Sequence, residues 1–404
     1  MAVGLGAMPV MHPVKGFALG VASAGIKKAG RRDLVLMRCA EGSSVAGVFT
    51  QNAFCAAPVQ LCKQRNGQPV RYLVTNTGNA NAATGAPGLK AAQQVCQAVA
   101  DSQQVPVEQV LPFSTGVIGE PLPVDRIAAA LPAAVADLQE DNWALAAEGI
   151  MTTDTIPKGA SRQFEHEGKA YTVTGISKGA GMIRPNMATM LAYVATDAGV
   201  EQELLQRLVR EAAGLSFNRV TVDGDTSTND CFMLIATGQQ GEKIISASDP
   251  LYASLREAVI EVAMLLAQAL VRDGEGATKF VTVQVEQGGT IQECLDVAYA
   301  VAHSPLIKTA LFASDPNWGR IVAAIGYAGV PGLEQEKVNV FLDDVCIVKD
   351  GGRADSYTEE QGEAVMQQEE ILIRIQLGRG DCSETIWTTD LSHEYVRINA
   401  EYRT

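Results

Sequence analysis

Apolar residues recur at helical spacing in three stretches of the chain. The longest stretch, residues 251–271, places an apolar residue every three or four positions, at Leu255, Val259, Val262, Leu266 and Leu270. This spacing puts them on one face of a helix that can pack on a core. A similar pattern predicts a helix over residues 202–215 and another that begins at about Pro87.

Shorter apolar runs predict strands over residues 71–75, 280–285, 338–342 and 371–377. The run 280–285 reads as apolar on both faces, which is typical of a strand in a covered sheet. The turn-rich stretch Asn76–Asn81 follows the first strand. Helices and strands alternate irregularly, so the pattern predicts an α/β protein built of α+β layers, without a regular βαβ repeat.

Composition narrows the class of protein. The 404 residues suffice for one large or two ordinary domains, and 46 acidic against 32 basic side chains give a formal charge of −14. A negative field of this size argues against nucleic-acid binding. No apolar run approaches about 18 residues, so no transmembrane helix is expected. The N-terminus lacks a basic region before an apolar stretch, which argues against a signal peptide.

Several motifs carry no functional weight. The eight cysteines form no CxxC pair, so we expect no zinc site. We expect their thiols to be reduced, as in a cytoplasmic protein. Gly4-Leu5-Gly6 lacks the third glycine and the preceding strand of a dinucleotide loop. No GxSxG or HExxH motif is present. We expect structural roles for the histidines His12, His166, His303 and His393.

The segment 175–191 suits an attack of the chain on its own backbone. Lys178-Gly179-Ala180-Gly181 is polar and glycine-rich, and Pro185 restricts the backbone on both sides of its peptide bond. The small Ala188 precedes Thr189, whose hydroxyl could attack the carbonyl before it. Cleavage there would give Thr189 a free α-amine with a pKa near ~7.7–8.0, which could act as base for its own hydroxyl. Taken alone, the segment also fits an ordinary loop that leads into a strand.

The wider sequence contains further motifs in a fixed order. This segment and those motifs resemble the ornithine acetyltransferase family, commonly called ArgJ. The motifs are Gly47–Thr50, Asn76–Asn81, Ser114–Gly119, Met151–Thr155, Lys178–Leu191, Asp223–Asp230, Asp273–Lys279, Ser314–Arg320 and Asn399–Thr404. They extend along nearly the whole chain.

The resemblance implies a fold and an assembly. The fold would be an α/β sandwich like that of self-processing aminopeptidases, with a smaller C-terminal α/β domain. Cleavage between Ala188 and Thr189 would give an α chain of residues 1–188 and a β chain of residues 189–404. Residues 189–280 would complete the sandwich and residues 281–404 would form the smaller domain, with a boundary near 275–290. The pieces would assemble as an α2β2 heterotetramer.

The resemblance also assigns residues. Thr189 is implied as the nucleophile, and Thr115 and Gly116 as the oxyanion hole. Lys178 could pair with a substrate carboxylate, and Glu275 could face the ornithine ammonium group. The implied substrate-binding residues are Thr152, Lys178, Thr189, Glu275, Asn399 and Thr404.

The implied activity is ping-pong transfer of an acetyl group from N-acetylornithine to glutamate, through an acetyl-threonine ester and without a bound cofactor. The sequence leaves open whether acetyl-CoA is also a co-substrate. Two other readings stay open: a self-processing amidohydrolase or aminopeptidase, and a binding protein without catalysis.

The remaining motifs are interpreted as turns or loops, or have no assigned role. We expect Asp223–Asp230 to form a hydrogen-bonded turn and no metal loop. Asn76–Asn81 is expected to form a loop near the site, with its glycine in a special backbone conformation. Arg184 and Ser314–Arg320 receive no role.

Overall fold

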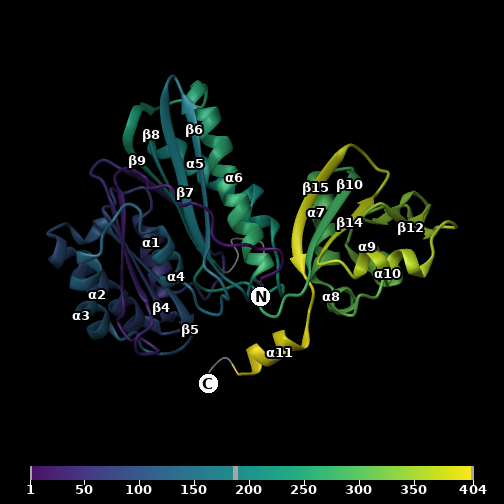
Figure 1. The fold of residues 1–404 in the computed structure, drawn as a ribbon, viewed down its shortest axis with the longest axis horizontal. Helices are drawn as coiled ribbons and strands as arrows, with labels where there is room; N and C mark the ends of the chain where they lie inside the picture. The colour runs from purple at the N-terminus through teal and green to yellow at the C-terminus, as the bar shows by residue number, and fades with distance from the viewer. Residues whose placement is uncertain (1, 185–189, 402–404) are drawn as a thin grey trace. The chain divides into compact units, whose positions relative to one another are not determined.

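The computed structural model describes residues 2–184 and 190–401. The chain divides into two compact units, and each is described by itself (Figure 1). The larger unit contains residues 7–218 and 225–270, and the smaller one contains Met1–Gly6, Arg219–Gly224 and Val271–Thr404. Among the described helices, none has the length and apolar character that a membrane span needs. All eight cysteines are free.

The larger unit contains two sheets. The first has the order β1 (Phe17–Ala22), β2 (Leu34–Cys39), β4 (Tyr72–Asn79) and β5 (Val110–Val117). The second has the order β3 (Ser44–Phe49), β9 (Cys231–Ile244), β8 (Leu191–Val200), β7 (Lys169–Lys178) and β6 (Lys158–His166). Six helices accompany them: α1 (Ala57–Arg65), α2 (Gly85–Gln103), α3 (Val124–Ala136), α4 (Trp143–Gly149), α5 (Gln202–Leu215) and α6 (Pro250–Arg272).

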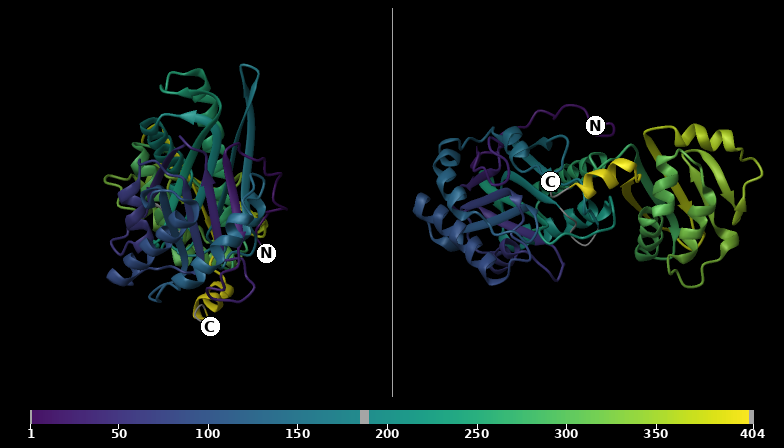
Figure 2. Two further views of the ribbon diagram at one scale, coloured as in Figure 1. Left: turned by 90° about the vertical axis from the view of Figure 1, so that its left-hand side faces the viewer. Right: turned by 90° about the horizontal axis from the view of Figure 1, so that it is seen from below.

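These elements form layers, which Figure 1 and Figure 2 show from different sides. Along β2, Leu34 and Leu36 pack with α2 and α3, while Val35 and Met37 point into a core between the two sheets. Successive side chains of a strand point to opposite faces, so a sheet covered on both faces is apolar at nearly every position. Helices α5 and α6 cover the outer face of the second sheet (Figure 1).

One end of this sandwich collects several strand ends. Strands β4 and β5 are parallel, so their carboxyl ends, Thr77–Asn79 and Thr115–Val117, lie side by side. In the second sheet β7 runs antiparallel to β8, and Lys178 at the end of β7 pairs with Leu191 at the start of β8. Leu191 also pairs with Cys231, at the start of the parallel β9.

The smaller unit has one six-stranded sheet with helices on one face. Its order is β13 (Gly352–Arg353), β12 (Val345–Lys349), β11 (Asn339–Leu342), β14 (Glu370–Gln376), β10 (Phe280–Gly288) and β15 (Cys382–Thr389). The helices are α7 (Ile291–His303), α8 (Pro305–Phe312), α9 (Trp318–Tyr327), α10 (Glu359–Met366) and α11 (His393–Ala400). Helices α7 to α10 contribute side chains to the core under the sheet.

The predicted α/β layers and the three predicted helices are confirmed. Two details were wrong. Strand β4 runs on through Asn79, into the stretch expected to be a turn, because β5 pairs with it in parallel. Strand β10 buries Val281, Val283 and Val285, while Thr282 and Gln284 are only half-buried. That sheet is therefore covered on one face and not on both.

Candidate active site

Thr115 and Gly116 lie at the carboxyl end of β5, opposite Thr77 and Gly78 of β4. Gly116 has a φ of +134° and Gly78 a φ of +91°, which side chains of L residues rarely allow. A Cβ atom on Gly116 would lie 2.3 Å from the carbonyl carbon of Gly78. The two backbones thus approach too closely for a side chain at 116. The predicted glycine in a special conformation within Asn76–Asn81 is confirmed at Gly78.

Lys178 brings the second sheet to these residues. Its Nζ donates a hydrogen bond of 3.3 Å to Oγ1 of Thr115, and the lysine is 5% exposed. The two side chains come from the ends of β7 and β5, which belong to different sheets. The sandwich therefore joins a predicted substrate-binding residue to a predicted oxyanion-hole residue, 63 positions apart in sequence.

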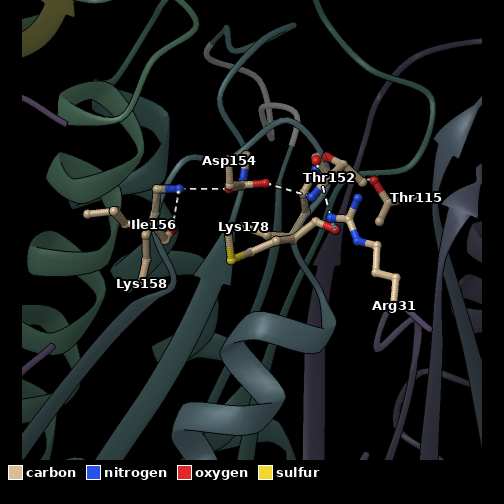
Figure 3. A network of polar contacts seen from close by, with 9 residues as sticks. Arg31, Thr115, Thr152, Asp154, Ile156, Lys158 and Lys178 are labelled. Carbon is tan, nitrogen blue, oxygen red and sulfur yellow. Dashed lines mark hydrogen bonds and ion pairs between the residues drawn. The ribbon is translucent and has the colours of Figure 1, made fainter. Parts of the chain in front are cut away.

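Asp154 organises the surroundings of Lys178 (Figure 3). One of its carboxylate oxygens accepts hydrogen bonds from Nζ of Lys158 and from the backbone N–H of Gly179, both 2.7 Å long. The other oxygen accepts from the backbone N–H of Thr152, at 2.9 Å. One buried carboxylate thus fixes the backbone of Thr152 and of the residue after Lys178.

The charges of this network are buried together. Burial alone would raise the pKa of Asp154, but Lys158 and Lys178 hold it well below its usual range, so the carboxylate stays ionised. Lys178 thus places a buried positive charge beside Thr115, of the kind that pairs with an anionic ligand such as an amino-acid carboxylate.

Arg31 also fixes the backbone at Thr152. The guanidinium group of Arg31 donates to the carbonyl oxygens of Met151 and Thr152, at 2.7 and 3.2 Å (Figure 3). Thr152 is thereby fixed through both its N–H and its carbonyl group. Sequence reasoning missed Arg31, Asp154 and Lys158. The only available signal was the position of Asp154 inside the motif Met151–Thr155.

Unsatisfied polar atoms mark the same end of the sandwich. Within the described residues, Oγ1 of Thr77, Oγ of Ser177 and Oδ2 of Asp230 are buried without a hydrogen-bond partner. Thr77 lies two residues before the end of β4, Ser177 one residue before the end of β7, and Asp230 directly before β9. Buried polar groups are normally paired, so a group of exceptions at one place is typical of a functional site.

Glu275 and Asn399 belong to the smaller unit. Nδ2 of Asn399, on the exposed side of α11, donates a hydrogen bond of 2.7 Å to the buried Glu275. Ser392 caps α11 and donates to the carbonyl oxygen of Gly276, at 2.6 Å. The turn that carries Glu275 and the helix that carries Asn399 are therefore joined, which brings these two predicted binding residues together.

Three predicted residues, Ala188, Thr189 and Thr404, lie outside the described residues. Arg184 is exposed. In the motif Ser314–Arg320, Asn317 caps α9 by accepting from the N–H of Arg320, which gives this motif a role in starting a helix. Within the described part of the chain, no group of three histidine, cysteine or acidic side chains could hold a metal ion.

Comparisons with known proteins show which proteins the chain is similar to. Residues 18–404 match the family described as the ArgJ family. Two relatives named arginine biosynthesis bifunctional protein ArgJ, from Pseudomonas syringae pv. tomato and Pseudomonas fluorescens, are 70% and 69% identical, and each alignment covers 100% of both chains. A crystal structure of the ArgJ protein from Bacillus halodurans is 35% identical over 52% of this chain and 97% of that one, with a TM-score of 0.49.

Proposed function

Because the chain belongs to the ArgJ family of arginine biosynthesis, we propose that it cleaves itself before Thr189 and then transfers acetyl groups from N-acetylornithine to glutamate. Thr189 acts as nucleophile in both half-reactions. The observation that carries the proposal is the contact between Lys178 and Thr115, which joins a cation for substrate carboxylates to a donor for the oxyanion.

The chemistry follows from that contact. The Thr189 hydroxyl attacks the acetyl carbonyl, and its own α-amine takes the proton. The Thr115 oxygen accepts a hydrogen bond from the Lys178 ammonium group, so the hydroxyl proton of Thr115 can point to the developing oxyanion. The N–H of Gly116 supplies the second donor. The C–N bond of the acetamide breaks and ornithine leaves with the proton, giving an acetyl ester on Thr189.

The second half-reaction reverses these roles. The amino group of glutamate attacks the ester carbonyl, the ester C–O bond breaks, and the Thr189 hydroxyl regains its proton. Lys178 can hold the α-carboxylate that ornithine and glutamate share, which explains how one site serves both amino acids. In the smaller unit, we propose Glu275 and Asn399 as further substrate-binding residues.

The test is the Thr189→Ala variant. We expect an uncut chain of full mass and no N-acetylglutamate, measured by intact mass spectrometry and by product assay with N-acetylornithine and glutamate. Thr189→Ser should keep a nucleophile and recover part of both activities. Thr309→Ala, on the exposed side of α8, is the control that should match the wild type. A cleaved and active Thr189→Ala variant would overturn the proposal.

Product identity separates transfer from hydrolysis. Release of acetate without N-acetylglutamate would make the enzyme an amidohydrolase. Supplying acetyl-CoA and glutamate without N-acetylornithine tests acetyl-CoA as a second acetyl donor, which we propose the enzyme also accepts.

We further propose that the cleaved pieces assemble in the cytoplasm as an α2β2 heterotetramer, which native mass spectrometry would detect.

A further inference from the structure

The segment before β9, Thr226–Asp230, contacts both halves of the proposed catalytic machinery. Nδ2 of Asn229 donates to the carbonyl oxygen of Ser114, at 2.8 Å, and to that of Ala80, at 2.6 Å. Ser114 directly precedes Thr115. Oδ1 of Asp230 accepts from the backbone N–H of Met190, at 2.9 Å, and Met190 directly follows Thr189. Two consecutive side chains thus hold the neighbours of the oxyanion donors and of the nucleophile.

The segment itself is firmly anchored. The Thr50 hydroxyl donates to the carbonyl oxygen of Ser227, and the N–H of Ala56 donates to that of Thr228. The backbone N–H of Thr50 also donates to the carbonyl oxygen of Asp230, at 3.0 Å. Asn229 and Asp230 are 6% and 1% exposed. Both side chains are therefore fixed before any substrate arrives, which catalysis by positioning requires.

The carboxyl group of Asp230 binds Met190 through only one of its two oxygens. Within the described residues no donor reaches Oδ2 with hydrogen-bond geometry, although the carboxyl group is buried. Burial raises the pKa of Asp230 well above its usual range, while the Met190 N–H, the charge of Lys178 and the nearby Ser227 and Thr50 hydroxyl groups act in the opposite direction. The other titratable groups that face it are Cys55 and Cys231, with Lys63 beside the two thiols.

We propose that Asn229 and Asp230 are positioning residues for the transfer reaction: Asn229 fixes the segment that carries Thr115 and Gly116, and Asp230 fixes Met190 at the start of β8 and acts through its charge on the α-amino group that cleavage gives Thr189. This inference rests on the proposed function. Consecutive backbone nitrogens lie at most about 3.6 Å apart. The new amine is therefore one backbone step from the N–H that Oδ1 already binds.

A charge effect distinguishes this role from simple support. Burial disfavours the ionised form of Asp230, but an ammonium group beside it favours that form, and the carboxylate favours the ammonium in return. Asp230 therefore raises the pKa of the Thr189 amine, which must be unprotonated to act as base. Removing the negative charge lowers the pKa of that amine, so the acid limb of kcat/KM moves to lower pH.

The experiment compares Asp230 with a matched residue at the other end of β8. Asp197 is also buried, and it also accepts a backbone hydrogen bond of 2.9 Å, from Thr172. Asp230→Asn keeps an oxygen for Met190 and loses the charge. We expect it to cleave itself and to show an acid limb about one pH unit lower. Asp197→Asn should keep the wild-type limb. An unmoved limb in Asp230→Asn overturns the inference.

Self-cleavage gives a second readout. Asp230→Ala removes both oxygens, and we expect its cleavage to be slowed at least about 10-fold against Asp197→Ala, because Met190, the neighbour of Thr189, loses its anchor. Equal cleavage rates overturn the inference. If Asp230→Asn does not fold, Asp230→Glu keeps the charge and displaces the oxygens. It should cleave slowly and keep the wild-type limb, and cleavage at the wild-type rate would overturn the inference.

The wild type separates the two proposals. A wild-type enzyme that neither cleaves itself nor makes N-acetylglutamate disproves the proposed function. A wild-type enzyme that does both, with Asp230 variants indistinguishable from the Asp197 variants, disproves the positioning role alone.

Discussion

Lys158 in the larger unit and Lys308 in the smaller unit are both almost fully buried, but their surroundings differ in charge. Lys158 donates to the Asp154 carboxylate, at 2.7 Å. Lys308 donates to the Thr388 hydroxyl, at 3.0 Å, and to the carbonyl oxygen of Thr389, which are neutral groups. Asp390 and Asp223 act on it only through their charge.

The two environments have opposite effects on the charge of the buried groups. Burial lowers the pKa of Lys308 to about 8, and the nearby Asp390 and Asp223 offset only part of that effect. In the larger unit the two lysines hold Asp154 in its charged form. A buried charge persists where a full opposite charge contacts it, and it becomes costly where only dipoles do. The end of the larger unit that carries Thr115 and Lys178 therefore keeps the buried Asp154 in its charged form.

The largest effect is expected for Asp154→Ala. The change leaves Lys158 and Lys178 buried without their carboxylate, and we expect the free energy of unfolding to fall by about 3–5 kcal/mol. Urea unfolding would measure it. Lys308→Met removes a disfavoured charge and should be nearly neutral at pH 7. Equal losses in the two variants would end the distinction drawn between the units. Asp154→Asn is the fallback if the alanine variant does not fold.

A smaller effect is expected in alkaline solution. The folded pKa of Lys308, about 8, is below its unfolded value of 10.5, so the unfolded chain binds more protons between these limits. The contribution of Lys308 to stability therefore improves as pH rises through that window, by on the order of 3 kcal/mol. We expect the difference in unfolding free energy between wild type and Lys308→Met to change by this amount between pH 8 and pH 10.5. The exposed Lys337→Met should show no such slope.

The smallest effect on stability is expected at the exposed end of the smaller unit. Asn399→Ala removes one hydrogen bond to Glu275, and it should cost no more than about 1 kcal/mol. If Asn399 binds substrate, KM for N-acetylornithine should rise several-fold while kcat changes little. Val396→Ala, one turn earlier on the exposed α11, is the control for both measurements. An unchanged KM would assign Asn399 to structure alone.

Local pattern predicted the long helices well. Helix α6 follows the spacing of Leu255, Val259, Val262 and Leu266, and each of these residues is buried. Such a stripe depends only on the helical repeat, which the sequence carries within a few turns. Strand β4 was predicted too short because its last residues, Thr77–Asn79, are ordered by the parallel β5, more than 30 residues further along the chain. Nothing near Asn76 encodes that partner.

The residues of the candidate site also divide into those that the sequence predicts and those that it does not. Thr115, Gly116, Thr152 and Lys178 could be named because they stand inside motifs that resemble a known family. Asp154 stands inside such a motif too, but it fixes Thr152 and Gly179 through their backbone N–H groups, and Arg31 fixes Met151 through its carbonyl oxygen. Backbone partners leave no trace in residue types, so a sequence pattern cannot reveal them.

The pairing of β7 with β8 has a consequence for the life of the protein after cleavage. A cut before Thr189 would leave β7 on one piece and β8 on the other, still joined along Val173–Lys178. The first piece also reaches into the smaller unit, where the N–H of Val3 binds the carbonyl oxygen of Arg272. Native enzyme would thus hold together without the peptide bond. Once denatured, however, its pieces could recombine only by collision, so recovery would depend on protein concentration and maturation would make folding effectively a one-time event.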